Sequence, residues 1–201
     1  MIFDPANPNV ISLDEAARLI QDGWLAQFRG RGWLSSLIQF ATGGVHSHSA
    51  MLQRVNGHVD CLEVREWIGG RRKPLEHHVG RWPGQIDVFS PDRNRFGEFK
   101  KHEAVKIMRQ MLVGDYGYAG ALRLALHKVP LLWRLWPLET RDDDPAGMKI
   151  VPFCSHAVCA ACRIGGGIDP VPNKPDHLVT PADLTNSLLF RYEFTLGKER
   201  G

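Results

Sequence analysis

The sequence contains few cysteines and no long apolar run, and both absences restrict what the chain can be. Four cysteines in 201 residues are too few for the disulfide framework of a small secreted domain, so reduced thiols are expected. No run approaches the roughly 20 apolar residues that cross a bilayer, and the N-terminus lacks the basic and apolar regions of a signal peptide. A cytoplasmic protein without a transmembrane segment is therefore predicted.

The chain also lacks an internal repeat, a low-complexity tract and a dense block of Lys and Arg. The formal net charge is +3, and acidic residues interrupt the basic cluster at 93–101. We therefore predict a solvated helix start there and no nucleic-acid partner. Hydrophobic residues make up 43% of the chain and charged residues 23%, which is typical of a globular protein. At this length we predict one domain over residues 1–201.

Helix and strand signals are both present. A capping box at 12–15 and the apolar periodicity that follows it predict a first helix that ends near Gly23. Further helices are predicted at 33–40, 98–112, 118–126, 154–165 and 181–184. Strands are predicted at 25–28, 85–90 and 188–196, and as a hairpin over 47–64 with Asn56-Gly57 at its turn. Residues 128–150 are predicted to form a long loop. This order of elements is typical of an α+β fold.

Cys154 is the first candidate for chemistry. Residues 151–153 are predicted to be extended and 155–161 helical, so Cys154 lies where a helix begins. The unpaired N–H groups and the positive dipole end of a helix stabilise a thiolate, which is the nucleophilic form of cysteine. The alternative is that Cys154 is a small buried apolar residue.

The hairpin supplies a base and a carboxylate. If Asn56-Gly57 forms a two-residue loop, His48 opposes Arg65, and Glu63 is its diagonal neighbour at roughly 7–8 Å. Because side chains alternate along a strand, His48 and Glu63 share one face. A carboxylate beside an imidazole fixes its tautomer, which is the third role in a Cys-His-acid triad. His46 is predicted to lie on the same face, so the register alone does not choose between the two histidines.

Several short segments resemble the YiiX-like group of circularly permuted NlpC-type cysteine peptidases. They are Ser47-His48-Ser49-Ala50-Met51, Leu62-Glu63-Val64, and Phe153-Cys154-Ser155-His156-Ala157-Val158. Residues 28–32 and 84–89 are also similar to segments of that group. The resemblance implies a permuted papain-like fold, in which an antiparallel sheet packs against helices and the nucleophile stands at a helix N-terminus.

The same resemblance assigns roles to the residues. It implies Cys154 as the nucleophile, His48 as the base in preference to His46, and Glu63 as the third residue of the triad. Tyr118 is similar to a family tyrosine that lines the substrate site. The implied protein is a thiol hydrolase, a peptidase or amidase, which acts on an amide bond without a cofactor. The expected substrate is a peptide or a cell-wall fragment.

One position departs from the family pattern. Members commonly carry an acidic residue two positions after the nucleophile, where this chain has His156. A Cys-x-His-x-Val pattern is also similar to the lecithin:retinol acyltransferase relatives, which move acyl groups of lipids. An acyl-lipid substrate, with hydrolysis or acyl transfer, is therefore the alternative. A non-catalytic binding domain with this fold is another. In that case Trp133, Trp136 and the leucines between Val129 and Leu138 could form a lid, a membrane-surface contact or a partner site.

A zinc site is a further alternative, because cysteine and histidine recur in the last predicted helix. Its ligands would be Cys154, His156, Cys159 and Cys162. On a regular helix, however, Cys154 and Cys159 point roughly 140° apart, so one helix cannot gather them around one ion. We therefore predict no metal, and we expect Cys159 and Cys162 to pack the helix against the sheet.

Overall fold

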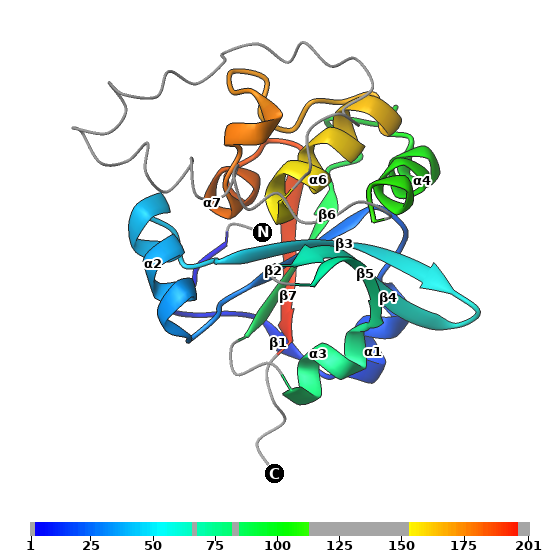
Figure 1. Ribbon diagram of the computed structural model, residues 1–201. Helices are drawn as coiled ribbons and strands as arrows, with labels where there is room; N and C mark the ends of the chain where they lie inside the picture. Colours follow the sequence, from blue (N-terminus) through cyan, green and yellow to red (C-terminus); the bar gives the residue numbers. More distant parts are fainter. Residues whose placement is uncertain (1–2, 66–67, 82–84, 113–152, 197–201) are drawn as a thin grey trace, which may run out of the picture.

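A twisted sheet between two layers of helices forms the centre of the computed structural model, which describes residues 3–65, 68–81, 85–112 and 153–196 (Figure 1). The strands are β1 (Val10–Ile11), β2 (Trp24–Phe28), β3 (His48–Val55), β4 (His58–Arg65), β5 (Gly69–Pro74), β6 (Ile86–Pro91) and β7 (Phe190–Leu196). The α-helices are α1 (Leu13–Leu19), α2 (Trp33–Thr42), α3 (Leu75–Arg81), α4 (Lys101–Met111), α6 (Cys154–Ala160) and α7 (Pro181–Thr185). A π-helical turn at Ala161–Gly165 continues α6, and a 3-10 turn lies at Asp176–Leu178.

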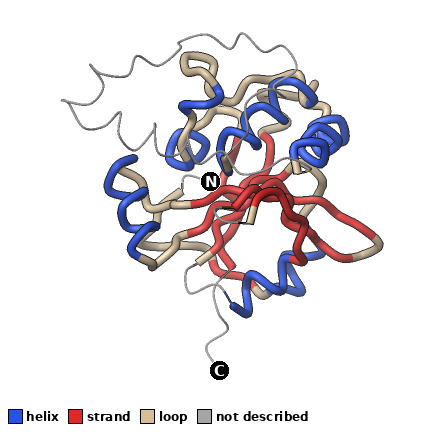
Figure 2. Tube along the Cα trace, viewed as in Figure 1, coloured by secondary structure: helices blue, strands red, loops and turns tan. Residues whose placement is uncertain are grey.

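The strands form one seven-stranded sheet in the order β1-β7-β6-β2-β3-β4-β5. All neighbouring strands pair antiparallel except β1 and β7, which are parallel. Figure 2 shows the strands as a continuous central layer, with α4, α6 and α7 on one side and α1 and α3 on the other. This arrangement confirms the predicted α+β class.

The hairpin of β3 and β4 forms at the predicted turn. Asn56 and Gly57 both have positive φ angles, 48° and 86°, as a two-residue turn of this kind requires. The pairing of β3 with β4 runs from Val55–His58 to Met51–Leu62 and includes Leu52–Cys61. The predicted register is therefore confirmed along this part of the hairpin.

The first helix is also confirmed, with a different end. The backbone N–H of Glu15 donates to the Ser12 side chain at 3.2 Å, which satisfies one of the orphan donors of α1. The helix ends at Leu19, and Ile20 rather than Gly23 is its C-cap residue. Gly23, with φ 76°, lies in the turn that leads into β2, so the glycine serves the turn and not the helix.

Two elements that the sequence did not predict, β5 and α3, complete one end of the sheet. The residues of β5 are glycines, basic residues and a proline, without the apolar alternation of a half-buried strand. The strand forms because it pairs along β4, from Asp60–Pro74 to Arg65–Gly69. The predicted helix at 118–126, the loop at 128–150 and Tyr118, Trp133 and Trp136 lie outside the described residues.

Strand alternation divides the apolar interior into two cores. Met51 and Leu62 pack on the face that α4 and α6 cover. Ala50 and Leu52, their neighbours along the strands, pack on the face that α1 and α3 cover. Each fully buried side chain of this size stabilises the fold by about 1.5–3 kcal/mol. In the described part of the chain, no helix combines the length and the apolar character needed to cross a membrane.

Candidate active site

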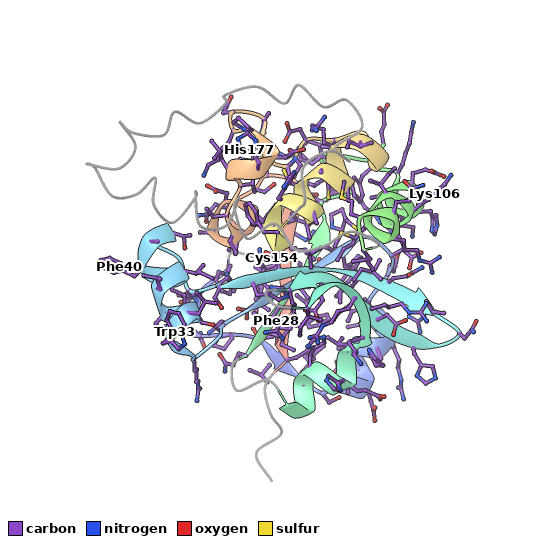
Figure 3. All side chains as sticks on the ribbon, in the orientation of Figure 1. Phe28, Trp33, Phe40, Lys106, Cys154 and His177 are labelled. Atoms are coloured by element: carbon purple, nitrogen blue, oxygen red, sulfur yellow. The ribbon has the colours of Figure 1, made fainter. Side chains whose placement is uncertain are left out.

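Cys154 is the first residue of α6, as the sequence predicts. The preceding residue, Phe153, is extended, with φ −107° and ψ 176°, and its side chain does not cap the helix. Only 5% of the Cys154 surface is exposed. Figure 3 shows Cys154 at the end of α6 that faces the sheet, above β3. The thiol therefore lies in the interior, at the junction of the helix layer and the sheet.

His48 joins Cys154 to Glu63. The His48 Nε2 atom lies 2.6 Å from a carboxylate oxygen of Glu63, and both residues are buried. Burial lowers the pKa of His48, but hydrogen bonds to Cys154 and Glu63 outweigh it and raise the pKa to about 10. Because Glu63 occupies Nε2, Nδ1 is the ring nitrogen left for the hydrogen bond with Cys154. The structure thus brings together all three residues that the sequence selects for a triad.

The position of His48 at the end of its strand explains how it meets both partners. Glu63 and its strand neighbour Cys61 point away from α6, and Cys61 belongs to the core under α1 and α3. Cys154 belongs to the core on the α6 side. As the first residue of β3, His48 lies where the sheet ends, so its ring can contact residues of both layers.

Two further residues, Arg71 and His78, hold Glu63 from the side away from His48. The Arg71 Nε atom lies 2.6 Å and the His78 Nε2 atom 3.2 Å from the second carboxylate oxygen. Burial raises the pKa of Glu63, but hydrogen bonds to His48 and His78 outweigh it and hold the pKa well below its usual range. The ring of Phe28 packs against both histidines, with its centroid 5.2 Å from that of His48 and 5.3 Å from that of His78. Glu63 is therefore an ionised, fixed carboxylate.

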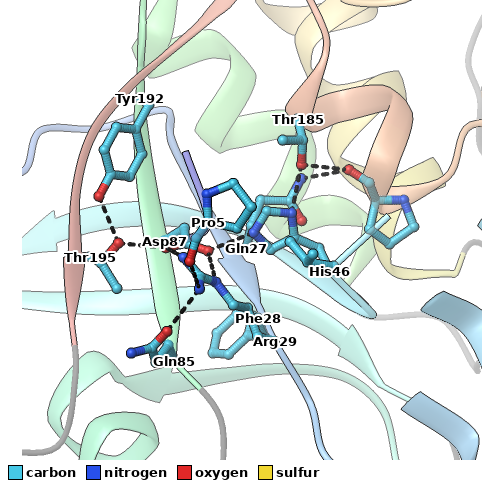
Figure 4. Close-up of polar contacts among 12 residues, drawn as sticks. Pro5, Gln27, Phe28, Arg29, His46, Gln85, Asp87, Thr185, Tyr192 and Thr195 are labelled. Atoms are coloured by element: carbon cyan, nitrogen blue, oxygen red, sulfur yellow. Dashed lines mark hydrogen bonds and ion pairs between the residues drawn. The ribbon is translucent and has the colours of Figure 1, made fainter. Parts of the chain in front are cut away.

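His46 occupies a separate buried network, shown in Figure 4. Its Nε2 atom lies 2.6 Å from Asp87, and its Nδ1 atom lies 2.9 Å from the Thr185 hydroxyl of α7. Arg29 donates two hydrogen bonds to Asp87, at 2.6 and 2.8 Å, and Thr195 donates a third. Burial lowers the pKa of His46 despite the neighbouring carboxylate.

The prediction that His46 shares a face with His48 is wrong. Asp87 pairs with Gln27 across β2 and β6, and Gln27 accepts a hydrogen bond from Ser49. Asp87 therefore lies on the face of Ser49, opposite to that of His48. Because β3 begins at His48, the strand alternation does not extend back to His46, and its side chain turns to the other face.

The remaining cysteines are buried and free of disulfides. Cys159 and Cys162 pack in the core between α6 and the sheet, as predicted, and burial raises the pKa of both thiols. Burial also raises the pKa of Cys61. His156 is buried on α6, with its ring 5.7 Å from that of Phe153. Cys61, Cys159 and Cys162 are therefore neutral thiols of the core.

A group of possible metal ligands that the sequence did not indicate lies beyond α6. Among the described residues, ligand atoms of Cys159, Asp169 and Asp176 lie within 4.8 Å of one another. Arg163 donates two hydrogen bonds to one oxygen of Asp176, at 2.9 and 2.7 Å. Of the four zinc ligands considered from the sequence, this group contains only Cys159. Its other two members, Asp169 and Asp176, come from the segment after α6, which folds back beside that helix.

Comparison with known proteins shows a likeness to a solved structure. No protein-family model and no curated protein matches the sequence. A crystal structure described as the metalloprotein yiiX from Escherichia coli O157:H7 superposes with a TM-score of 0.61. The chain has a yiiX-like fold. The two sequences are 17% identical, and the match covers 89% of this chain and 97% of yiiX, so the likeness concerns the fold and extends over nearly the whole length of both.

Proposed function

We propose that this chain is a cysteine hydrolase with Cys154 as nucleophile, His48 as base and Glu63 as the residue that orients the base. The observation that carries the proposal is the placement of His48, which shares one hydrogen bond with the Cys154 thiol and another with the buried carboxylate of Glu63. A nucleophile next to a base that a third group orients is the pattern of covalent catalysis.

The proposed reaction proceeds through a thioester. His48 takes the proton of Cys154, and the sulfur attacks the carbonyl carbon of an amide or ester. The backbone N–H of Cys154, at the start of α6, is a donor for the resulting oxyanion. His48 then gives its proton to the departing nitrogen or oxygen, and the C–N or C–O bond breaks. Water, deprotonated by His48, finally attacks the thioester and releases the acid and the thiol.

The finer assignment is a permuted papain-like enzyme of the NlpC type. It is supported by the chain order, because the histidine strand precedes the cysteine helix, and by the yiiX-like fold. The substrate class follows from this assignment: a peptide or cell-wall amide is the first candidate. His156, two residues after the nucleophile, keeps a lipid acyl ester and acyl transfer as the second candidate. Because these alternatives share the attack on a carbonyl, the first test concerns the thiol.

The test is the pH profile of thiol alkylation by iodoacetamide. We expect Cys154 of the wild type to react faster than the three core cysteines, because His48 lies beside it and can take its proton. His48→Ala should lose this reaction, whereas His58→Ala, which changes an exposed histidine in the same hairpin, should keep it. Mass spectrometry locates the label, and Cys154→Ala is the blank. Equal rates in wild type and His48→Ala, or labelling of another cysteine, would contradict the proposal.

Metal binding is a second candidate function, favoured by the group formed by Cys159, Asp169 and Asp176 and by the description of yiiX as a metalloprotein. Once Cys159 loses its proton on binding, one thiolate and two carboxylates would make a donor set that suits Zn²⁺, with a fourth position for water. We expect about one zinc per chain by elemental analysis, and its loss in Asp169→Asn. Cys162→Ser, a change at a neighbouring buried cysteine outside the group, is the control. Metal-free wild-type protein after growth with zinc would exclude this function.

A further inference from the structure

Helix α2 presents bulky apolar side chains to solvent. None of its ten residues is buried. Trp33 is 80% exposed and Phe40 89% exposed, and Leu37 between them is about half exposed. In Figure 3 the labelled side chains of Trp33 and Phe40 project from α2 at the margin of the molecule, away from the sheet. A surface helix of a globular protein normally turns its apolar stripe to the core, so this stripe needs another explanation.

The apolar sector of α2 is wider than the described residues of the protein cover. At about 100° per residue, Trp33, Leu37 and Phe40 fall within roughly 60° of arc. The adjoining sector is half-buried and contains Leu34, Ile38 and Ala41. The polar residues occupy the rest of the circumference: Ser35, Ser36, Gln39 and Thr42. The half-buried sector holds the helix on the protein, and the exposed sector beside it is free to enter another apolar phase.

The charge of the surrounding segment indicates which phase this is. No Asp or Glu occurs between Asp22 and Asp60, and α2 itself has no charged residue. Arg31, two residues before Trp33, is exposed. A short apolar helix with aromatic residues and a neighbouring basic side chain has the features of a helix that lies in the headgroup region of a bilayer.

The same features make a second copy of this chain a poor partner for the exposed face of α2. Three side chains of this size bury at most about 600 Å², below the roughly 800 Å² per partner of a stable interface. A symmetric contact through α2 would also bring Arg31 near its own copy, and like charges across an interface are unfavourable. A bilayer with anionic lipids meets both the apolar stripe and the basic residue.

The helix is held firmly next to the candidate active site. The Gln39 side chain donates to the carbonyl of Gly30, before α2, and to that of Val45, after it, at 3.0 and 2.8 Å. Ser47, the residue before His48, accepts a hydrogen bond from the Gly30 N–H at 3.2 Å. The two segments that flank α2 are thus joined to each other and to the start of β3. Contact of α2 with a surface would fix the orientation of the His48 end of the sheet on that surface.

We propose that α2 is a membrane-docking element that inserts Trp33, Leu37 and Phe40 into the interfacial region of an anionic bilayer, with Arg31 at the headgroups. This inference goes beyond the hydrolase proposal and does not depend on it, because docking requires no chemistry at Cys154. If both hold, the site acts at a membrane surface, where acyl lipids are within reach.

The experiment is co-sedimentation with vesicles of phosphatidylcholine mixed with phosphatidylglycerol, and of phosphatidylcholine alone. We expect the full chain to bind the mixed vesicles more strongly. The variant Trp33→Ser/Phe40→Ser should bind at least about tenfold more weakly, because two aromatic side chains no longer enter the interface. Leu19→Ser/Leu188→Ser changes two exposed apolar residues outside α2 and should bind as the wild type does. Circular dichroism checks that each variant is folded, and Phe40→Gln replaces the double variant if that one is not.

Docking would be overturned if the folded wild type bound neither vesicle, or if the wild type and the α2 variant bound equally. It would also be overturned if the wild type were a dimer that becomes monomeric on Trp33→Ser/Phe40→Ser, because α2 would then be the contact with a second copy. The alkylation rate of Cys154 separates the two proposals. It should be unchanged in the α2 variant without vesicles, and Cys154→Ala should bind vesicles like the wild type.

Discussion

Two histidines only two positions apart are held in opposite electrostatic states. Each places Nε2 at 2.6 Å from a buried carboxylate, His48 on Glu63 and His46 on Asp87. The pKa of His48 is nevertheless raised, whereas that of His46 is lowered. Burial lowers the pKa of both rings. At His48 the hydrogen bonds with Cys154 and Glu63 outweigh burial, whereas at His46 burial outweighs the effect of Asp87, and the positive charge of Arg29 adds to it. A carboxylate partner alone does not decide the charge of a buried imidazole.

Replacement of Glu63 by Gln tests how much depends on one buried charge. The change leaves Arg71 and His48 in the interior without their anion, and removal of one partner of a buried ion pair costs about 3–5 kcal/mol. We expect the free energy of unfolding, measured by urea denaturation, to fall by about that amount. On any substrate that the wild type turns over, Glu63→Gln should reduce the rate less than His48→Ala, because the base itself remains.

The matched control for this variant is Glu103→Gln. Glu103 forms its ion pair with Lys106 on the surface of α4, and both side chains are more than half exposed. Exposed pairs of this kind contribute roughly 0.3–0.5 kcal/mol, so the control should be nearly neutral. A loss of stability in Glu63→Gln no larger than in Glu103→Gln would contradict the view of Glu63 as a buried anion.

At the scale of elements, the parts of the fold that local rules determine could be predicted. The β3–β4 register follows from the turn, because two residues with positive φ fix which residues stand opposite each other. The junction at Cys154 follows from the change between extended and helical patterns. The relation of His48 to Glu63 needed only these local facts, so it was accessible without the structure.

The missed partners depend on long-range pairing. Arg71 meets Glu63 because β5 pairs with β4, and the residues of β5 have no strand pattern of their own. Asp87 meets His46 because β6 pairs with β2, nearly 60 residues earlier in the chain. No local rule specifies such pairs, because side chains from several elements have to pack before the strands choose their neighbours.

Replacement of Gly57 by Ala tests the element that determines the register. Gly57 has φ 86° and a Cβ there would meet no atom within 4 Å, so the cost is that of backbone conformation alone, about 1 kcal/mol or more. We expect a lower midpoint in thermal unfolding. Gly80→Ala is the control: this glycine lies in α3, also with open space for a Cβ, and there alanine should be neutral or stabilising by up to about 1 kcal/mol. Equal effects at both positions would mean that the turn does not require its positive φ.

For the whole molecule, the two histidine networks differ in the layers that they connect. The His46 network lies on the side of α6 and α7, and the His48 network reaches from α6 to the opposite side of the sheet. The His48 network connects α6 with β4, β5 and α3 through Cys154, Glu63, Arg71 and His78. The His46 network connects β6, β7, β2 and α7 through Asp87, Thr195, Arg29 and Thr185. Each network contributes to the stability of the fold, and their opposite pKa shifts give the contributions opposite pH dependence.

The sign of each contribution follows from proton binding. The pKa of His48 is raised in the folded state to about 10, so its contribution is complete below the ordinary histidine pKa of about 6.5 and is lost as the pH rises toward 10. The pKa of His46 is lowered, so its contribution is complete above about pH 6.5 and is lost as the pH falls. The pKa values of Cys61, Cys159 and Cys162 are also raised. The stability that these thiols contribute is lost only above about pH 8.5, the ordinary pKa of cysteine.

The variants His48→Asn and His46→Asn should therefore change different limbs of the stability curve. Between about pH 6.5 and 8.5 the wild type should lose stability as the pH rises, and His48→Asn should flatten this limb. Between about pH 6.5 and 4.5 the wild type should lose stability as the pH falls, and His46→Asn should flatten that limb. Urea denaturation at a series of pH values measures both slopes, independently of the constant loss that each substitution causes. If both variants flatten the same limb, the two imidazoles do not differ in charge, and His48 loses its distinction as the base beside Cys154.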